Sequence, residues 1–128
     1  MKKMFLLFSH TLSREQRLDG EQNLDVGEFV SLDAKLQRLW SDISPEIESL
    51  KSLLEPFKEF LKSNAKKGDF VLIQGDFGAS YEMVCFSKKL GLVPIYATTK
   101  RMVSEENQSE KIIKKSIFIH RRFREYGV

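Results

Sequence analysis

The chain has 128 residues, of which 41% are hydrophobic and 30% are charged, with one cysteine and a formal net charge of +3. A chain of this size is expected to form a single domain over residues 1–128 with a real hydrophobic core. No apolar run approaches the roughly 20 residues that a membrane-spanning helix needs, and the apolar stretch near the N-terminus is too short for a signal peptide. We therefore expect a cytoplasmic protein without a membrane partner.

The net charge is unevenly distributed along the chain. From residue 97 onward there are eight lysines and arginines against four acids, a net charge of +4, which leaves −1 for the first 96 residues. Basic charge beside a ligand-binding edge favours a phosphorylated partner. A solvated hairpin whose lysines keep it soluble explains the same count equally well.

The first third of the chain predicts two strands around a short helix. Residues 4–8 form a solid apolar run, as expected for a central strand that is covered on both faces. Ser13 and Gln16 form a capping-box pattern, which predicts the start of a short and very polar helix. Residues 29–32 then suggest a second strand at the outside of the sheet.

Residues 33–64 are expected to be helical. A short segment containing Trp40 comes first, and a longer helix is expected to start at Ser44 and Pro45, because proline is well tolerated in a first turn. Apolar residues recur along this helix at spacings of three and four. Pro56 falls inside the stripe and should bend or split the helix. Core cover is the favoured role of this region, with a lid and a dimer surface as alternatives.

Residues 69–101 form the unit around which the rest of the chain is organised. Strands are expected over residues 70–73 and 93–97, and the helix between them ends at Gly91, where a left-handed residue commonly terminates a helix. A unit of this length favours a right-handed crossover and two parallel strands. Both strands then end at the same edge of the sheet, which is where open α/β sheets bind ligands.

The C-terminal part is expected to add an antiparallel piece. Residues 104–115 resemble a long hairpin loop. Residues 116–123 alternate as a strand, with Arg121 on one face and both His120 and Arg122 on the other. The predicted fold class is therefore α/β, a mostly parallel sheet of strand order 2-1-3-4 with an antiparallel C-terminal strand or hairpin.

Polar residues follow three strands of the predicted sheet and are expected to converge at its carboxyl edge. They are Ser9 and His10 after the first strand, Gln74, Gly75, Asp76, Phe77, Gly78, Ala79 and Ser80 in a glycine turn, and Thr98, Thr99, Lys100 and Arg101 after the fourth strand. The turn matches neither a P-loop nor a dinucleotide fingerprint. Its glycines would let the backbone approach a ligand closely, and its last three N–H groups could accept an anion. A turn that only caps a helix is an equally good explanation.

No pattern in the sequence points to a metal or a cofactor. His10 has the setting of a structural histidine, although its place beside Ser9 on the central strand favours a functional role. There is no carboxylate–histidine cluster with the spacing of metal ligands, and no nucleophile elbow. Any catalysis is therefore expected to rest on positioning and charge.

Three segments carry a resemblance to a known family. Residues 5–10, 69–80 and 93–101, together with His120, Arg121 and Phe123, resemble small stand-alone CRISPR-associated proteins, which are Rossmann-like (CARF-like) relatives of the sensor domains that bind cyclic oligoadenylates in type III systems. The similarity runs nearly end to end. It implies a ring nuclease, a homodimer that binds cyclic tetra-adenylate across its two-fold axis and linearises it to switch off an antiviral signal.

The resemblance suggests a metal-independent mechanism. A ribose 2′-hydroxyl can attack its own 3′-phosphate if the two are held in line, leaving a 2′,3′-cyclic phosphate. Lys100 and Arg101 would stabilise the charge on phosphorus and His10 would transfer a proton. Ser9, with Thr98 or Thr99, would hold the phosphate or ribose. Gln74 and Asp76 would read the adenosine.

Two other functions stay open from the sequence. The chain could sequester or sense the same cyclic ligand without cleaving it, because one fold hosts both activities. It could also be an interaction subunit whose basic tail binds RNA or protein, and strongly salt-dependent binding to linear RNA would identify that function. DNA is not an expected partner.

Overall fold

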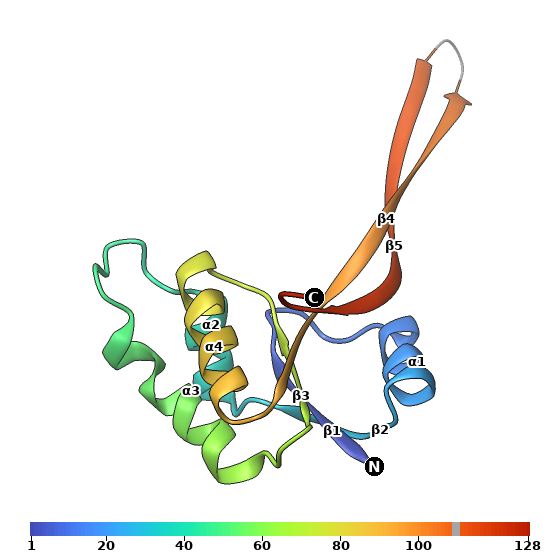
Figure 1. Cartoon of the computed structure of the whole chain (residues 1–128). Helices are drawn as coiled ribbons and strands as arrows, with labels where there is room; N and C mark the ends of the chain where they lie inside the picture. Colours follow the sequence, from blue (N-terminus) through green and yellow to red (C-terminus); the bar gives the residue numbers. More distant parts are fainter. Residues whose placement is uncertain (109–110) are drawn as a thin grey trace.

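The computed structural model describes the backbone of residues 1–108 and 111–128 (Figure 1). A five-stranded sheet has the order β2-β1-β3-β4-β5, in which the first four strands are parallel and β5 runs antiparallel to β4. The predicted α/β class, the strand order 2-1-3-4 and the antiparallel C-terminal addition are therefore confirmed. The strands are β1 (Lys2–Leu7), β2 (Val26–Ser31), β3 (Phe70–Ile73), β4 (Val93–Gln108) and β5 (Lys111–Glu125).

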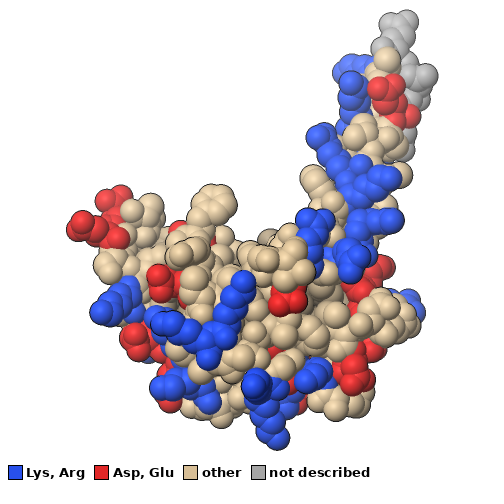
Figure 2. Space-filling view, viewed as in Figure 1, with Lys and Arg blue, Asp and Glu red and all other residues tan. Residues whose placement is uncertain are grey.

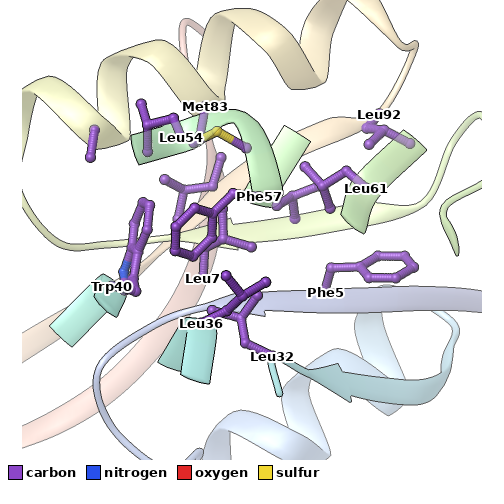
Figure 3. Close-up of a cluster of buried hydrophobic side chains, with 13 residues drawn as sticks. Phe5, Leu7, Leu32, Leu36, Trp40, Leu54, Phe57, Leu61, Met83 and Leu92 are labelled. Carbon is purple, nitrogen blue, oxygen red and sulfur yellow. The ribbon is translucent and has the colours of Figure 1, made fainter. Parts of the chain in front are cut away.

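Helices cover both faces of the sheet. The bounds are α1 (Arg14–Asn23), α2 (Ala34–Ser41), α3 (Lys51–Asn64) and α4 (Phe77–Lys89). Helices α2, α3 and α4 pack on one face of the sheet (Figure 3). The cluster on the opposite face includes Phe123, near the C-terminal end of β5, and lies on the side of α1. None of the helices in the described part of the chain is long and apolar enough to cross a membrane.

Strand β1 is buried on both sides, as its apolar run predicts. Phe5 and Leu7 belong to the cluster under α2, α3 and α4, whereas Met4 and Leu6 belong to the cluster on the opposite face. Successive side chains of a strand point to opposite faces, so a central strand needs apolar residues at every position. Each fully buried side chain of this size stabilises the fold by about 1.5–3 kcal/mol.

Local signals in the first half behave as predicted, except at β2, which begins at Val26 instead of residue 29, and at α3. The capping box is formed, since the hydroxyl of Ser13 accepts the N–H of Gln16 at 3.1 Å and the Gln16 side chain accepts the N–H of Ser13 at 2.9 Å. The expected helix start at Ser44 is wrong. Its hydroxyl accepts the N–H of Glu46 at 3.2 Å, a local turn that competes with helix, and α3 begins at Lys51.

Helix α3 confirms the predicted core cover. It is continuous through Pro56, so the expected split does not occur. Pro56 lies in the second turn, where it removes the partner of one carbonyl only. Leu54, Phe57 and Leu61 follow at spacings of three and four and have no exposed surface. The stripe seen in the sequence therefore faces the sheet.

The predicted loop over residues 104–115 is wrong. Strand β4 continues to Gln108 and β5 starts at Lys111, so the described part of that loop is a paired hairpin, and residues 109–110 lie outside the described residues. Figure 1 shows the two strands rising away from the rest of the molecule. The polarity of the segment indicated a loop, but its isoleucines are strong strand formers and cross-strand pairing decides the conformation.

A β-bulge at the root of this hairpin changes which side chains share a face. Thr98 pairs with Arg122, whereas Thr99 pairs with His120, so Arg121 is the extra residue. The predicted sharing of a face by His120 and Arg122 is therefore wrong. Because the bulge shifts the alternation, His120 lies on the same side as Phe123, with 4.9 Å between the ring centroids.

Candidate functional site

A pocket of about 520 Å³ opens at the carboxyl end of β3, beside the start of α4. This volume is within the range of small-molecule sites, about 300–1,000 Å³. We call it the aromatic pocket because of its lining, which consists of Gln74, Gly75, Phe77, Ser80, Tyr81, Val84, Tyr96 and Tyr126.

Helix α4 supplies one wall of the aromatic pocket. Its residues Ala79 and Met83 are buried against the sheet. Phe77, Tyr81 and Val84 follow one another at spacings of four and three, so they form a separate stripe on the helix. Phe77 is 95% exposed and Tyr81 is 69% exposed. Aromatic rings left in water beside a hollow are suited to stack on a flat ligand such as a nucleobase.

Two tyrosines from distant parts of the chain form the opposite wall. Tyr96 of β4 and Tyr126 after β5 have ring centroids 4.8 Å apart. The Tyr126 hydroxyl donates to the carbonyl of Ile73 at 2.6 Å, which ties the C-terminus to the end of β3. Burial, and then the neighbouring Tyr96, raise the pKa of Tyr126, so its hydroxyl stays protonated and able to donate.

Arg124 places a cation at this wall. Its guanidinium carbon lies 5.5 Å from the centroid of the Tyr96 ring, and its Nη1 donates to the Tyr96 hydroxyl at 3.2 Å. A guanidinium stacked in this way is held in position and can face an anionic group of a ligand. The pocket therefore combines aromatic surface with one positive charge at its border.

The Gln74 side chain is fixed in one orientation. Its Oε1 accepts the backbone N–H of Ala97 at 2.8 Å. A backbone N–H can only donate, so the accepting atom is the oxygen and the amide NH₂ is left as a donor. Ser80 adds a second polar group, since its hydroxyl is buried without a hydrogen-bond partner among the described residues. These groups can bind acceptor atoms of a ligand.

The glycine turn caps α4, which limits its use as an anion site. Asp76 Oδ2 accepts the N–H of Ala79 at 3.0 Å, and the Asp76 carbonyl accepts the N–H of Ser80 at 2.8 Å. Two of the three N–H groups predicted to bind an anion are therefore already bonded, and only that of Gly78 has no such partner in the described structure. Packing alone explains the glycine at position 75, because a Cβ there would lie 2.8 Å from Nε1 of Trp40.

Ser9 and His10 lie in a different pocket. This second hollow, of about 430 Å³, is at the carboxyl ends of β1 and β2, and Arg17 also lines it. His10 is exposed and contacts Phe8 edge-on, with ring centroids 5.4 Å apart. The two pockets share no lining residue. Because β1 and β3 are parallel neighbours with Leu7 paired to Ile73, Ser9 and His10 follow β1 at the same sheet edge as the glycine turn, as predicted, but they line a different hollow.

Thr98, Thr99, Lys100 and Arg101 lie inside β4 and not at a strand end, which corrects the prediction. The Thr98 hydroxyl donates to the carbonyl of Arg122 at 2.8 Å, and the Arg101 guanidinium donates to the Ser116 hydroxyl at 3.1 and 2.9 Å. The strand continues past them because β5 pairs with it. None of the four lines the aromatic pocket or the pocket of Ser9 and His10.

A buried histidine–aspartate contact joins the root of β5 to α1. His120 Nε2 and Asp19 Oδ2 are 2.8 Å apart, and their side chains are 6% and 15% exposed. Burial opposes ionisation of Asp19, but hydrogen bonds from Asn23 and His120 and the interaction with the His120 charge outweigh it and lower the Asp19 pKa. We call this the α1–β5 contact. No group of three histidine, cysteine or acidic residues in the described structure is placed to hold a metal ion.

Sequence reasoning missed Tyr81, Tyr96, Tyr126 and Arg124 as site residues. A signal for Tyr81 was available, because α4 has apolar residues on two faces and a helix packed on a sheet needs only one. No local pattern could have found the two other tyrosines, which meet only through the hairpin that returns the C-terminus to β3.

Comparison with known proteins gives a family without an assigned activity. The sequence matches the Uncharacterized protein MJ1673 family over residues 2–124, a range that includes every residue of the aromatic pocket except Tyr126. It is 51% identical over 127 residues to the uncharacterized protein MJ1673 of Methanocaldococcus jannaschii, covering 99% of this chain and 98% of that relative. No solved structure matches the chain.

Proposed function

Because the chain belongs to the MJ1673 family, whose name states no activity, we propose from its site that it binds a cyclic oligoadenylate, with cyclic tetra-adenylate as the first candidate, and linearises it. In this proposal the sheet is a Rossmann-like, CARF-like domain that acts as a cytoplasmic homodimer and switches off type III CRISPR antiviral signalling. The aromatic pocket is the observation that carries the proposal.

An adenine ring fits the chemistry of the aromatic pocket. Phe77 and Tyr81 offer stacking surfaces, and stacking of a base on an aromatic side chain contributes about 1–3 kcal/mol. The Gln74 amide donates to acceptors, and the ring nitrogens of adenine are acceptors. A pocket of about 520 Å³ suits one nucleotide and not a whole ring of four. The remaining nucleotides would extend beyond it, in keeping with a ligand shared across a two-fold axis.

Cleavage would use the ligand's own hydroxyl. The ribose 2′-oxygen forms a bond to the adjacent phosphorus, the bond from phosphorus to the 5′-oxygen breaks, and the proton passes from the 2′-oxygen to the 5′-oxygen. His10 is the candidate for moving this proton, and Lys100 and Arg101 are candidates for stabilising the developing charge. Ser9 and Thr98 or Thr99 would hold the phosphate or ribose outside the aromatic pocket.

Binding without cleavage is the second candidate, and one observation favours it. The lining of the aromatic pocket contains no histidine, lysine, arginine or carboxylate. A base can therefore be bound there without contacting His10, Lys100 or Arg101, the residues proposed to act in cleavage. Such a protein would lower the free concentration of the cyclic ligand by sequestering it.

The deciding experiment is incubation of the protein with radiolabelled cyclic tetra-adenylate in EDTA, with products separated by chromatography. Linear product ending in a 2′,3′-cyclic phosphate is the expected result and excludes an obligatory divalent metal. Intact ring that co-elutes with the protein would support sequestration. The same mixture is followed by Trp40 fluorescence. An intact ring that does not co-elute with the protein, together with unchanged fluorescence, would overturn both functions.

A further inference from the structure

The outer part of the β4–β5 hairpin exposes an unusual amount of apolar surface. We call residues 99–108 and 111–120 the ribbon (Figures 1 and 2). Seven of its described side chains are large, apolar and exposed, from 36% for Ile113 to 67% for Phe118. The others are Met102, Val103, Ile112, Ile117 and Ile119. An apolar surface of this kind on a protein usually marks an interaction site.

Both faces of the ribbon carry apolar side chains. Met102 pairs with Ile117 on one face, whereas Phe118 pairs with Arg101 on the other. Among the ribbon residues whose burial the structure describes, none belongs to either buried cluster. An isolated two-stranded hairpin is at best marginally stable in water, and a ribbon with two unpaired apolar faces cannot bury them alone. The ribbon therefore needs a partner.

The charge of the ribbon matches a loop of the same protein. Between residues 99 and 120 five cations and three acids give a net charge of +2. Residues 42–48, between α2 and α3, contain Asp42, Glu46 and Glu48 and no cation, a net charge of −3. Ile47 in this acidic loop is 42% exposed. The basic and apolar surface of the ribbon is therefore complementary to the acidic loop, which offers negative charge and one exposed apolar side chain.

The acidic loop and the ribbon of one chain are far apart. Figure 1 shows them at opposite ends of the view, and Figure 2 shows acidic side chains at the loop end and basic side chains along the ribbon. A contact between them therefore has to join two copies. When each copy supplies one ribbon and one loop, the two contacts are equivalent and close a two-fold dimer.

We infer that the ribbon is an arm that packs on the acidic loop of a second copy of this chain, around Ile47. RNA fits the ribbon less well. Proteins bind RNA through phosphate charge and aromatic stacking, and between residues 99 and 120 there are four isoleucines and a single phenylalanine. A second copy is also what a cyclic ligand shared across a two-fold axis would need. The tests of the inference use no cyclic oligoadenylate, so its failure is separate from failure of the proposed ligand.

The first test measures self-association by analytical ultracentrifugation. The wild-type protein is expected to be a dimer that weakens as salt is added. Ile117→Ser with Ile119→Ser should raise the dimer dissociation constant about tenfold or more. The control is Leu18→Ser, which changes an apolar residue of similar exposure, 38%, on α1, and should leave the dissociation constant unchanged.

The second test does not depend on the ribbon variant folding well. Reversing the charge of the acidic loop with Glu46→Lys and Glu48→Lys should weaken the dimer. Reversing the charge of the ribbon with Lys111→Glu and Lys114→Glu should weaken it as well. A one-to-one mixture of these two variants should restore association, because both contacts of the mixed dimer are again between opposite charges. Glu21→Lys on α1 is the control that should have no effect.

Cross-linking then identifies the contact. A carbodiimide joins lysines to carboxylates that touch, and a mixture of ¹⁴N- and ¹⁵N-labelled protein shows which products join two copies. We expect products that link Lys111 or Lys114 of one copy to Glu46 or Glu48 of the other. A monomeric wild-type protein, a dimer that neither pair of variants weakens, or a ribbon that binds single-stranded RNA on a monomer would each overturn the inference.

Discussion

Single residues under the aromatic pocket are connected by hydrogen bonds. Trp40 donates its indole N–H to the carbonyl of Gln74 at 3.0 Å, and the Gln74 side chain accepts the N–H of Ala97. The buried indole of α2 is thereby joined through the end of β3 to β4. Trp40 is the only tryptophan in the sequence, so its fluorescence reports on this region. Any change in the backbone at Gln74 should be visible in that signal.

The two glycines of the turn should respond oppositely to substitution. A Cβ at Gly75 would lie 2.8 Å from Trp40 Nε1, so Gly75→Ala should destabilise the protein by about 1–3 kcal/mol. At Gly78 the nearest atom outside the turn is 3.4 Å away, and alanine in a helix is favoured over glycine by about 0.5–1 kcal/mol. Urea unfolding followed by Trp40 fluorescence measures both. Equal effects would contradict this account of the turn.

Phe77 should matter for the ligand and not for the fold. Because its side chain is 95% exposed, Phe77→Ala should change the free energy of unfolding by less than about 0.5 kcal/mol. Loss of one stacking surface should weaken binding of cyclic tetra-adenylate about tenfold. Titration calorimetry measures the affinity, with Leu18→Ala as the exposed apolar control. Unchanged affinity in Phe77→Ala would remove the pocket from the binding site.

Among the elements, the α1–β5 contact holds the hairpin against α1 at the point where the bulge interrupts β5. The bulge at Arg121 turns His120 and Phe123 to the same side, where His120 reaches Asp19 of α1. A regular strand would direct these two rings to opposite faces. The contact therefore joins the hairpin to a helix that is more than a hundred residues earlier, since Asp19 and His120 are 101 positions apart.

The stability of this contact should depend on acid pH. The Asp19 pKa is lowered in the folded state from the ordinary value of 3.8, so its contribution is complete above that value and is lost as the pH falls through the lower, folded pKa. Asp19→Asn should lower the free energy of unfolding at neutral pH by about 1.5–3 kcal/mol, the value of a hydrogen bond to a charged group.

Urea unfolding at neutral pH and at about pH 3 measures how much of the acid loss of stability comes from Asp19. The wild-type protein should lose more stability between these conditions than Asp19→Asn does. The control is Glu21→Gln, an exposed acid on the same helix, which should lose as much as the wild type. If Asp19→Asn shows the full wild-type loss, Asp19 is not the group responsible.

For the molecule as a whole, we expect that most of the ribbon can be removed without unfolding the rest of the protein. Lys100 and Ile119 are paired across the hairpin, so the residues between them can be replaced by Asn-Gly, a turn that closes two-residue hairpins. The shortened protein keeps His120 and both buried clusters. Its free energy of unfolding per chain should change by less than about 1 kcal/mol, and it should be monomeric in ultracentrifugation. An unfolded product, or a dimer, would contradict this division.

Much of the fold followed from local patterns. The apolar run of β1, the capping box at Ser13 and the left-handed residue at Gly91, whose φ is +75°, are properties of neighbouring residues and were readable in the sequence. The strand order also followed, because parallel strands joined by a helix cross over with one hand. The start of α3 did not, since the hydroxyl of Ser44 stabilises a turn that the helical pattern conceals.

The candidate site depended more on distant parts of the chain. Local patterns were enough to predict that Gln74 to Ser80 follow β3 and lead into a helix, and the structure confirms that arrangement. Two features of the site depend on contacts between distant parts of the chain: Tyr126 reaches the pocket through a hydrogen bond to a residue 53 positions away, and residues 98–101 continue a strand. The spacing of residues in a sequence indicates which side chains are neighbours within one helix or strand. The pairing of β4 with β5 and the contact of Tyr126 with β3 form between elements that are distant in the sequence, so no local pattern predicts them.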